Sequence, residues 1–198
     1  MFVTFEGLDG SGKSTQAKLL AEALAADGRE VIATREPGGT ELGEHVRELL
    51  LAEGEVAPWA EAALFAAARA QLVEDVIAPA LERGADVICD RYLDSSLAYQ
   101  GIARDLGLDR VLELNLHAVR GVLPDRTYLL LVDPAESARR VGKEGDRIER
   151  EDDDFRARVD VAYRQLAEVF PERIQVIDGT RPPREIGEEV LDELRQRS

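Results

Sequence analysis

Apolar residues along this 198-residue chain alternate between short continuous runs and longer stretches with helical spacing. The short runs are rich in β-branched residues and predict buried strands. These strands are expected at residues 2–5, 30–34, 85–89, 127–132 and 174–177. The run 127–132 is apolar at nearly every position, which predicts a central strand covered on both faces.

The stretches with helical spacing lie between the strands. Helices are expected from about Gly12 to Gly28, at 42–52, 58–82 and 106–120, from Pro134 onward, and at 155–170 and 183–196. Thr40 suits an N-cap and Pro58 a first helical turn, while Gly28, Gly84 and Gly121 suit positions just after helices. Strands that alternate with helices predict a doubly wound α/β fold with a mostly parallel sheet of about five strands.

Neither an internal repeat nor a linker interrupts this alternation, so one domain over residues 1–198 is expected. Part of the alanine-rich stretch 58–82 is apolar on more than one face. We therefore expect it to pack against a neighbouring element or a second subunit.

The residues after the first strand carry the clearest chemistry. Residues 7–14 read G-L-D-G-S-G-K-S and match the phosphate-binding loop G-x-x-x-x-G-K-[ST]. Glycines allow backbone N–H groups to turn inward, and the helix N-terminus adds partial positive charge. Lys13 suits the β- and γ-phosphates, and the Ser14 hydroxyl suits Mg²⁺. A chance glycine-rich turn is the alternative, but the strand and helix on either side favour a nucleoside triphosphate site. That site comprises Gly7, Leu8, Asp9, Gly10, Ser11, Gly12, Lys13, Ser14 and Thr15.

Polar residues also end the strand at 85–89. Because ligands of parallel sheets bind beyond the carboxyl ends of strands, Asp90 and Arg91 are expected to share the crevice of the phosphate-binding loop. Asp90 suits a carboxylate near Mg²⁺ and Arg91 suits a substrate phosphate, with a surface ion pair as the alternative. A short segment that can border the same cleft follows, with Ser95, Ser96, Tyr99 and Gln100.

Other candidates are ambiguous from pattern alone. Arg47 is typical of an exposed charge on a helix, and Phe65 and Arg69, four apart, are typical of packing with an extended arginine. Residues 139–150 combine glycines, acids and basic residues. This segment is either a solvated loop or a mobile lid that supplies arginines to a phosphoryl-transfer site.

The charge, the apolar runs and the cysteine and histidine content exclude several classes of protein. With 25 basic and 40 acidic residues the net charge is −15, which argues against a nucleic-acid partner and requires local arginines to capture an anionic substrate. No apolar run approaches the ~20 residues of a membrane span. Cys89 is the only cysteine and lies in an apolar run, typical of a buried thiol, and His45 and His117 lack metal-ligand spacing. A cytoplasmic enzyme is expected.

Four stretches in order give the chain a resemblance to bacterial thymidylate kinases (dTMP kinases) over nearly its whole length. They are residues 5–15, 35–40, 90–101 and 146–149, which read F-E-G-L-D-G-S-G-K-S-T, R-E-P-G-G-T, D-R-Y-L-D-S-S-L-A-Y-Q-G and D-R-I-E. The resemblance implies a P-loop kinase that transfers the ATP γ-phosphate to dTMP with Mg²⁺, giving dTDP and ADP for dTTP synthesis. It also implies a homodimer and a lid at about 139–150.

The resemblance carries roles onto matching positions. Lys13, Asp9, Arg91 and Arg147 are implied to be catalytic, and Ser14 and Asp90 to serve Mg²⁺. Phe65 is implied to stack on thymine and Arg69 to bond its O4. Positions implied to bind dTMP are Asp9, Arg35, Glu36, Arg47, Phe65, Arg69, Arg91, Ser96, Tyr99 and Gln100.

Two departures affect the surroundings of these positions. The family often shows F-A-A-D-R-A-Q-H where residues 65–72 read F-A-A-A-R-A-Q-L. Ala68 removes a carboxylate that could brace an arginine, and Leu72 removes a histidine. No basic residue lies between Gly7 and Gly12, so the lid is expected to supply further positive charge. The candidates are Arg139, Arg140, Lys143 and Arg147, and the sequence does not choose among them.

Rival functions make different demands on the sequence. A nucleotide-switch GTPase needs an N-K-x-D motif, which is absent. A kinase for another small molecule would keep every phosphate-site argument and change only the acceptor pocket. A non-catalytic ATP-binding module would lack the acceptor arginines.

Overall fold

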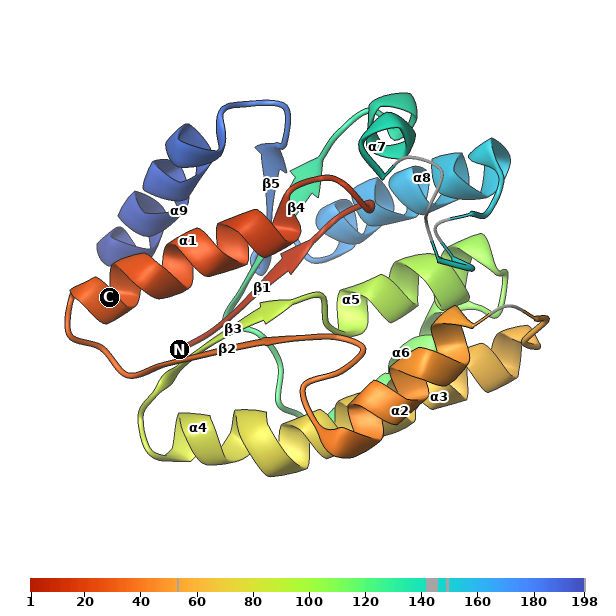
Figure 1. Ribbon diagram of the computed structural model, residues 1–198, viewed down its shortest axis with the longest axis horizontal. Helices are drawn as coiled ribbons and strands as arrows, with labels where there is room; N and C mark the ends of the chain where they lie inside the picture. The colour runs from red at the N-terminus through yellow and green to blue at the C-terminus, as the bar shows by residue number, and fades with distance from the viewer. Residues whose placement is uncertain (53, 142–145, 149, 198) are drawn as a thin grey trace.

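The structure, a computed structural model, describes residues 1–52, 54–141, 146–148 and 150–197 (Figure 1). Its centre is a five-stranded sheet in the order β2-β3-β1-β4-β5, in which every neighbouring pair is parallel. The strands are β1 (Phe2–Glu6), β2 (Val31–Arg35), β3 (Asp86–Asp90), β4 (Arg126–Leu131) and β5 (Ile174–Asp178). The predicted fold class is therefore confirmed, and the strand order reverses at β1, where a crevice opens beyond the carboxyl ends of the strands.

Helices cover both faces of this sheet (Figure 1). On one face lie α1 (Lys13–Ala26) and α9 (Pro183–Arg197), which pack against each other. The other helical segments are α2 (Glu41–Leu51), α3 (Pro58–Leu72), η1 (Val73–Ile77), α4 (Ala78–Glu82), α5 (Leu93–Ser96), η2 (Leu97–Ala103), α6 (Leu108–Val119), α7 (Pro134–Val141) and α8 (Asp153–Val169). Among the described residues, no helix is long and apolar enough to span a membrane.

The central strand β4 contributes to two separate cores. Leu130 packs in one cluster with Leu20 of α1, whereas Leu129 belongs to another with Val159 of α8. Since successive side chains of a strand point to opposite faces, both faces of β4 are covered, as its apolar run predicts. Cys89 of β3 is likewise fully buried.

Several predicted helix ends are confirmed by local geometry. The Thr40 hydroxyl caps α2 by accepting a 3.0 Å hydrogen bond from the Gly43 N–H. Gly28 follows α1 with φ of 81°, in the left-handed region that a glycine adopts without a steric penalty.

One helical prediction needs correction. The stretch 58–82 is not one regular α-helix, because a π-helical turn, η1, separates α3 from α4. Pro79 has no N–H to bond to the carbonyl of residue 75, and the hydrogen-bond spacing widens just before it. The short segment expected after Asp90 is helical, with the π-helical η2 carrying Tyr99 and Gln100.

A buried ion pair joins the helical layer to the sheet. Asp94 of α5, only 1% exposed, receives Nη1 and Nη2 of Arg173 at 2.5 and 2.7 Å. Arg173 directly precedes β5, and its Nη1 also donates to Thr127 of β4 at 2.8 Å. The pair therefore fixes α5, which begins next to the crevice, against β4 and β5.

We predict that Arg173→Ala lowers the free energy of unfolding by about 3–5 kcal/mol, because it leaves the Asp94 carboxylate buried without its partner. The matched control is Arg164→Ala, which breaks an i,i+4 pair with Asp160 in which Arg164 is 53% exposed. That control should cost about 0.3–0.5 kcal/mol. Urea denaturation measures both, and similar losses for the two variants would contradict a structural role for the buried pair.

Candidate active site

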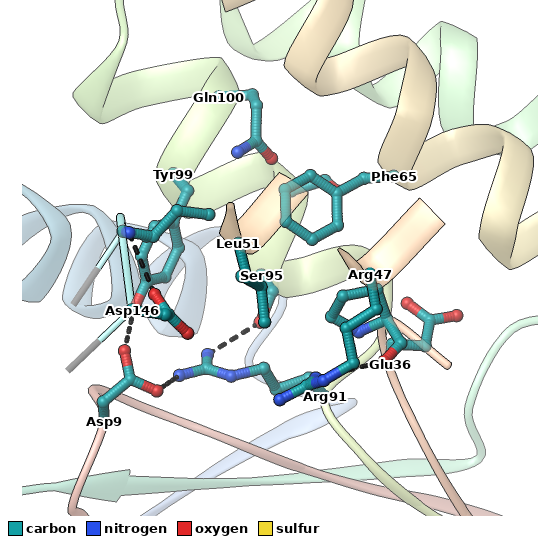
Figure 2. Close-up of a pocket in the computed structure, with 13 residues that line it drawn as sticks. Asp9, Glu36, Arg47, Leu51, Phe65, Arg91, Ser95, Tyr99, Gln100 and Asp146 are labelled. Atoms are coloured by element: carbon teal, nitrogen blue, oxygen red, sulfur yellow. Dashed lines mark hydrogen bonds and ion pairs between the residues drawn. The ribbon is translucent and has the colours of Figure 1, made fainter. Parts of the chain in front are cut away.

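The carboxyl ends of β1, β2 and β3 border a crevice. Asp90, at the end of β3, is in register with Phe5 of β1 and Arg35 of β2. One hollow beside the phosphate-binding loop and a second extending to Phe65 both include Asp9, Glu36, Arg47 and Arg91 in their lining. The two hollows thus form one crevice with the phosphate-binding loop at one end and an aromatic ring at the other (Figure 2).

The phosphate-binding loop follows β1 and leads into α1, as predicted. Gly7 has φ of 137°, and a Cβ there would lie 2.4 Å from the Leu130 carbonyl oxygen, so only glycine fits. Lys13 is buried at the start of α1, where its Nζ donates to the Leu8 carbonyl at 2.8 Å and lies 3.9 Å from Asp9 Oδ1. The ammonium group of Lys13 is therefore held against the phosphate-binding loop.

Ser14 and Asp90 meet at the same end of the crevice. The Ser14 hydroxyl donates to Asp90 Oδ2, while Asp90 Oδ1 is buried and has no hydrogen-bond partner among the described residues. A hydroxyl and a carboxylate are the hard oxygen ligands that Mg²⁺ prefers. The described residues contain no cluster of three His, Cys, Asp or Glu side chains, so a metal here needs further ligands from a nucleotide or water.

Arg91 forms the middle of the crevice (Figure 2). Its Nη2 donates to Asp9 Oδ1, and its Nη1 donates to Ser95 Oγ and Tyr163 Oη at 3.0 and 3.1 Å. The guanidinium also lies 5.5 Å from the centre of the Tyr99 ring. Burial raises the pKa of Asp9, but the charges of Arg91 and Lys13 outweigh it and lower that pKa to about 2. Asp9 is therefore ionised and orients Arg91.

Glu6 holds the loop that carries Arg91, and sequence reasoning missed it. Its Oε1 accepts from the backbone N–H groups of Tyr92 and Ser95 at 2.8 and 3.2 Å. Its Oε2 accepts from the Ser95 and Tyr163 hydroxyls at 2.6 and 2.9 Å. The available signal was a charged residue at the end of an apolar strand, directly before the phosphate-binding loop.

Arg35 and Arg47 lie at the mouth of the crevice. Arg35 is paired with Glu44 at 3.0 Å, and Arg47 Nη1 donates to the Pro37 carbonyl at 3.1 Å. Both line the hollow beside the phosphate-binding loop. The structure thus brings these two arginines and Arg91 together, as the family resemblance implies.

At the opposite end, Phe65, Ser96, Tyr99 and Gln100 line the hollow, but Arg69 does not. Arg69 is 1% exposed, and its five N–H groups all have protein partners. These partners are Glu36 through Nε and Nη2, the Tyr92 carbonyl through Nη2, and Ser96 and Asn115 through Nη1. Arg69 therefore lies behind Ser96 in this structure, and its implied bond to thymine O4 stays a prediction.

The two family departures are explained by packing. Ala68 is buried against Val46 and Leu50, and Leu72 is buried in the largest core cluster. Glu36 supplies the carboxylate that braces Arg69, at 2.5 Å from Nη2. A carboxylate at position 68 is thus not needed for this purpose.

The basic residues of the expected lid contact different parts of the protein. Arg140 Nη1 donates to the Gly10 carbonyl at 3.2 Å, whereas Arg139 is exposed and pairs with Glu136. The structure does not bring Arg147 to the phosphate-binding loop: its Nη2 pairs with Glu61 at 2.6 Å and its Nε donates to the Leu50 carbonyl at 2.9 Å. Lys143 and the rest of 142–145, together with residue 149, lie outside the described residues.

Comparisons with known proteins agree on one family. A sequence model described as Thymidylate kinase matches residues 5–190. The chain is 49% identical to a thymidylate kinase of Pelotomaculum thermopropionicum over 96% of its length and 94% of that protein. It is 52% identical to one of Bifidobacterium longum, covering 91% and 90%. The crystal structure of thymidylate kinase from Ehrlichia chaffeensis superposes with a TM-score of 0.81 at 36% identity, covering 98% of each chain.

We predict that Lys13 titrates with a midpoint near pH 8 in the ligand-free protein. Burial and the charge of Arg91 together lower the pKa of Lys13 to about 8, because they outweigh the opposing effect of Asp9, Asp90 and Glu6. NMR of lysine ¹³Cε measures it, with Lys13→Arg identifying the resonance. Asp9→Asn should lower the midpoint because it removes a stabilising negative charge. A midpoint above 10 would contradict this electrostatic account.

Proposed function

The chain belongs to the thymidylate kinase family, and on this premise we propose which of its residues carry out the reaction. It transfers the γ-phosphate of ATP to dTMP, giving dTDP and ADP in the synthesis of dTTP. The observation that carries the assignment of residues is the continuous crevice, with the phosphate-binding loop at one end, Phe65 at the other, and Arg91 between them.

At the donor end, residues 7–15 hold the ATP phosphates. Backbone N–H groups at the start of α1 provide donors, and Lys13 provides the fixed positive charge beside the β- and γ-phosphates. A donor of this kind at the point where negative charge develops is worth roughly 10²–10³ in rate. Arg140, in contact with Gly10, is the basic residue of α7 best placed to add charge to this loop.

Mg²⁺ would be held by the Ser14 hydroxyl and, directly or through water, by Asp90, whose buried Oδ1 has no partner among the described residues. When bound, the ion neutralises charge on the transferred phosphoryl group. Asp90 is fixed by its place at the end of β3, so the chain positions this carboxylate independently of the nucleotide.

The acceptor phosphate lies by Arg91, with Arg47 and Arg35 on its outer side. Asp9 orients Arg91 and lies near the dTMP sugar and phosphate, beside the Tyr99 hydroxyl at 3.4 Å. These arginines overcome the net charge of −15 locally and hold the dTMP phosphate in line with the ATP γ-phosphate.

At the base end, Phe65 stacks on thymine, and Ser96, Gln100 and Glu36 complete the pocket. The Ser96 Oγ accepts from Arg69 Nη1 at 3.0 Å, so its own proton is free to be donated toward the base. We therefore assign Arg69 to base selection through Ser96. Direct contact with thymine O4 would require Arg69 to give up one of its present partners.

Arg147 has two partners at the base end. A role at the phosphates requires it to leave Glu61 and the Leu50 carbonyl. Its present contacts favour a contribution to the acceptor pocket, which its neighbours Asp146 and Ile148 line.

We also propose a cytoplasmic homodimer. Helix α3 exposes Ala60, Ala63 and Ala67 along one side, and the neighbouring α6 exposes Leu116. Small side chains allow two helices to approach closely, so this surface suits a second copy of the chain. The buried, unpaired Cys89 is consistent with a reducing compartment.

We predict that kcat/KM with ATP and Mg²⁺ falls in the order dTMP, dUMP, dCMP, with purine monophosphates excluded by size. Loss of the 5-methyl group is worth about 1–3 kcal/mol at most, whereas the cytosine amino group places a donor against the Ser96 donor. Phe65→Ala should lower kcat/KM for dTMP by roughly 10- to 100-fold, the value of base stacking on an aromatic ring. Val161→Ala, an exposed apolar residue of α8 outside the crevice, is the control and should have little effect. Equal use of dCMP and dTMP by the wild-type enzyme would show that the acceptor assignment is wrong.

A further inference from the structure

We propose that Glu61 is a positioning residue for base selection, because its carboxylate fixes which end of the Gln100 amide faces the acceptor base. The inference rests on the proposed function, which places the base between Phe65 and Gln100. Glu61 itself does not line the crevice and would not contact dTMP.

The contact is buried and joins two elements that are distant in sequence. Glu61 lies on α3 and Gln100 on η2, and each is 1% exposed. Gln100 Nε2 donates to Glu61 Oε1 at 2.9 Å. Gln100 also lines the hollow that contains Phe65, and Figure 2 shows its amide pointing into the space in front of that ring.

The chemistry of the two groups sets the orientation of the amide. A carboxylate only accepts hydrogen bonds, whereas an amide has a donating NH₂ at one end and an accepting oxygen at the other. The Gln100 nitrogen must therefore face Glu61. Within the described part of the chain, no donor is paired with Gln100 Oε1, which leaves an acceptor for the crevice.

Two arginines keep Glu61 free of a proton. Arg104 Nε lies 3.2 Å from Oε1, and Arg147 Nη2 lies 2.6 Å from Oε2. Burial raises the pKa of Glu61, but the hydrogen bonds from Gln100, Arg147 and Arg104 outweigh it and hold that pKa below its ordinary value. Arg104 is itself paired with Glu151 at 2.6 Å, which fixes its position. A protonated Glu61 could donate to Gln100 and reverse the amide, and this arrangement prevents it.

With its amide oxygen facing the base, Gln100 distinguishes bases by whether ring nitrogen N3 carries a hydrogen. Thymine and uracil carry an N3–H that can donate to Gln100 Oε1. Cytosine carries a lone pair at N3, which would face the amide oxygen without a proton between them. Glu61 would thus favour dTMP and dUMP over dCMP while leaving the 5-methyl preference to other contacts.

The test compares kcat/KM for dTMP and dCMP in wild-type and Glu61→Gln enzymes. The neutral amide of Glu61→Gln accepts or donates, so Gln100 is free to reverse. The dTMP:dCMP ratio should then fall by about 10- to 100-fold, the effect of one mismatched buried hydrogen-bonding group. Glu74→Gln is the matched control: Glu74 lies in η1, which continues α3, and is an exposed partner of Arg120, so its ratio should stay as in wild type. A purely structural role for Glu61 would lower turnover of both substrates and leave the ratio unchanged, which would overturn the inference.

Gln100→Ala supplies the second arm and does not depend on whether Glu61→Gln folds. It should reduce the same ratio, and adding Glu61→Gln to it should reduce the ratio no further, because Glu61 acts through Gln100. An unchanged ratio in Gln100→Ala, or an additive further loss in the double variant, would overturn the inference. Failure of the wild-type enzyme to phosphorylate dTMP would instead overturn the proposed function.

Discussion

The Glu6 carboxylate, buried at the end of β1, is the constraint on which the active site depends. It accepts hydrogen bonds from two backbone N–H groups and two hydroxyls, contributed by Tyr92 in the loop after β3, by Ser95 of α5 and by Tyr163 of α8. These bonds hold Arg91 at φ of 67°, a conformation that costs energy for a residue other than glycine. Because the phosphate-binding loop begins at the next residue, Gly7, one strand fixes both the donor loop and the acceptor arginine. The in-line geometry of phosphoryl transfer needs that relation.

Buried acidic groups play a similar part elsewhere around the crevice. Glu36 holds Arg69, Asp94 holds Arg173, and Glu61 holds Gln100 together with two arginines. Removing one partner of such a pair leaves a buried charge uncompensated, so each arrangement is strongly specified even where the pair itself adds little net stability. The acidic residues that give the chain its negative charge therefore include carboxylates that hold arginine and glutamine side chains in fixed orientations around the crevice.

The sequence was sufficient for features that depend on local pattern. All five strands lie within one residue of their predicted bounds, because an apolar run followed by a turn is a local signal. The phosphate-binding loop followed from its motif, and the meeting of Asp90 and Arg91 with that loop followed from the rule that strand ends meet at one edge of a parallel sheet. The grouping of Arg35 and Arg47 with Arg91 followed only from the family resemblance. The positions of Arg69 and Arg147 did not follow, since their partners Glu36 and Glu61 are separated from them by 33 and 86 residues. Spacing along a helix gives the face on which a residue lies but not the side chain that meets it from another element.

The most direct test of the central claim is a double-mutant cycle between Glu6 and Arg91, measured as kcat/KM for dTMP. If Glu6 acts by aiming Arg91, Glu6→Gln should lower kcat/KM by about 10- to 100-fold in the wild-type background and only slightly when Arg91 is already alanine. An equal loss in both backgrounds would mean that Glu6 supports the fold in general and does not position the acceptor arginine.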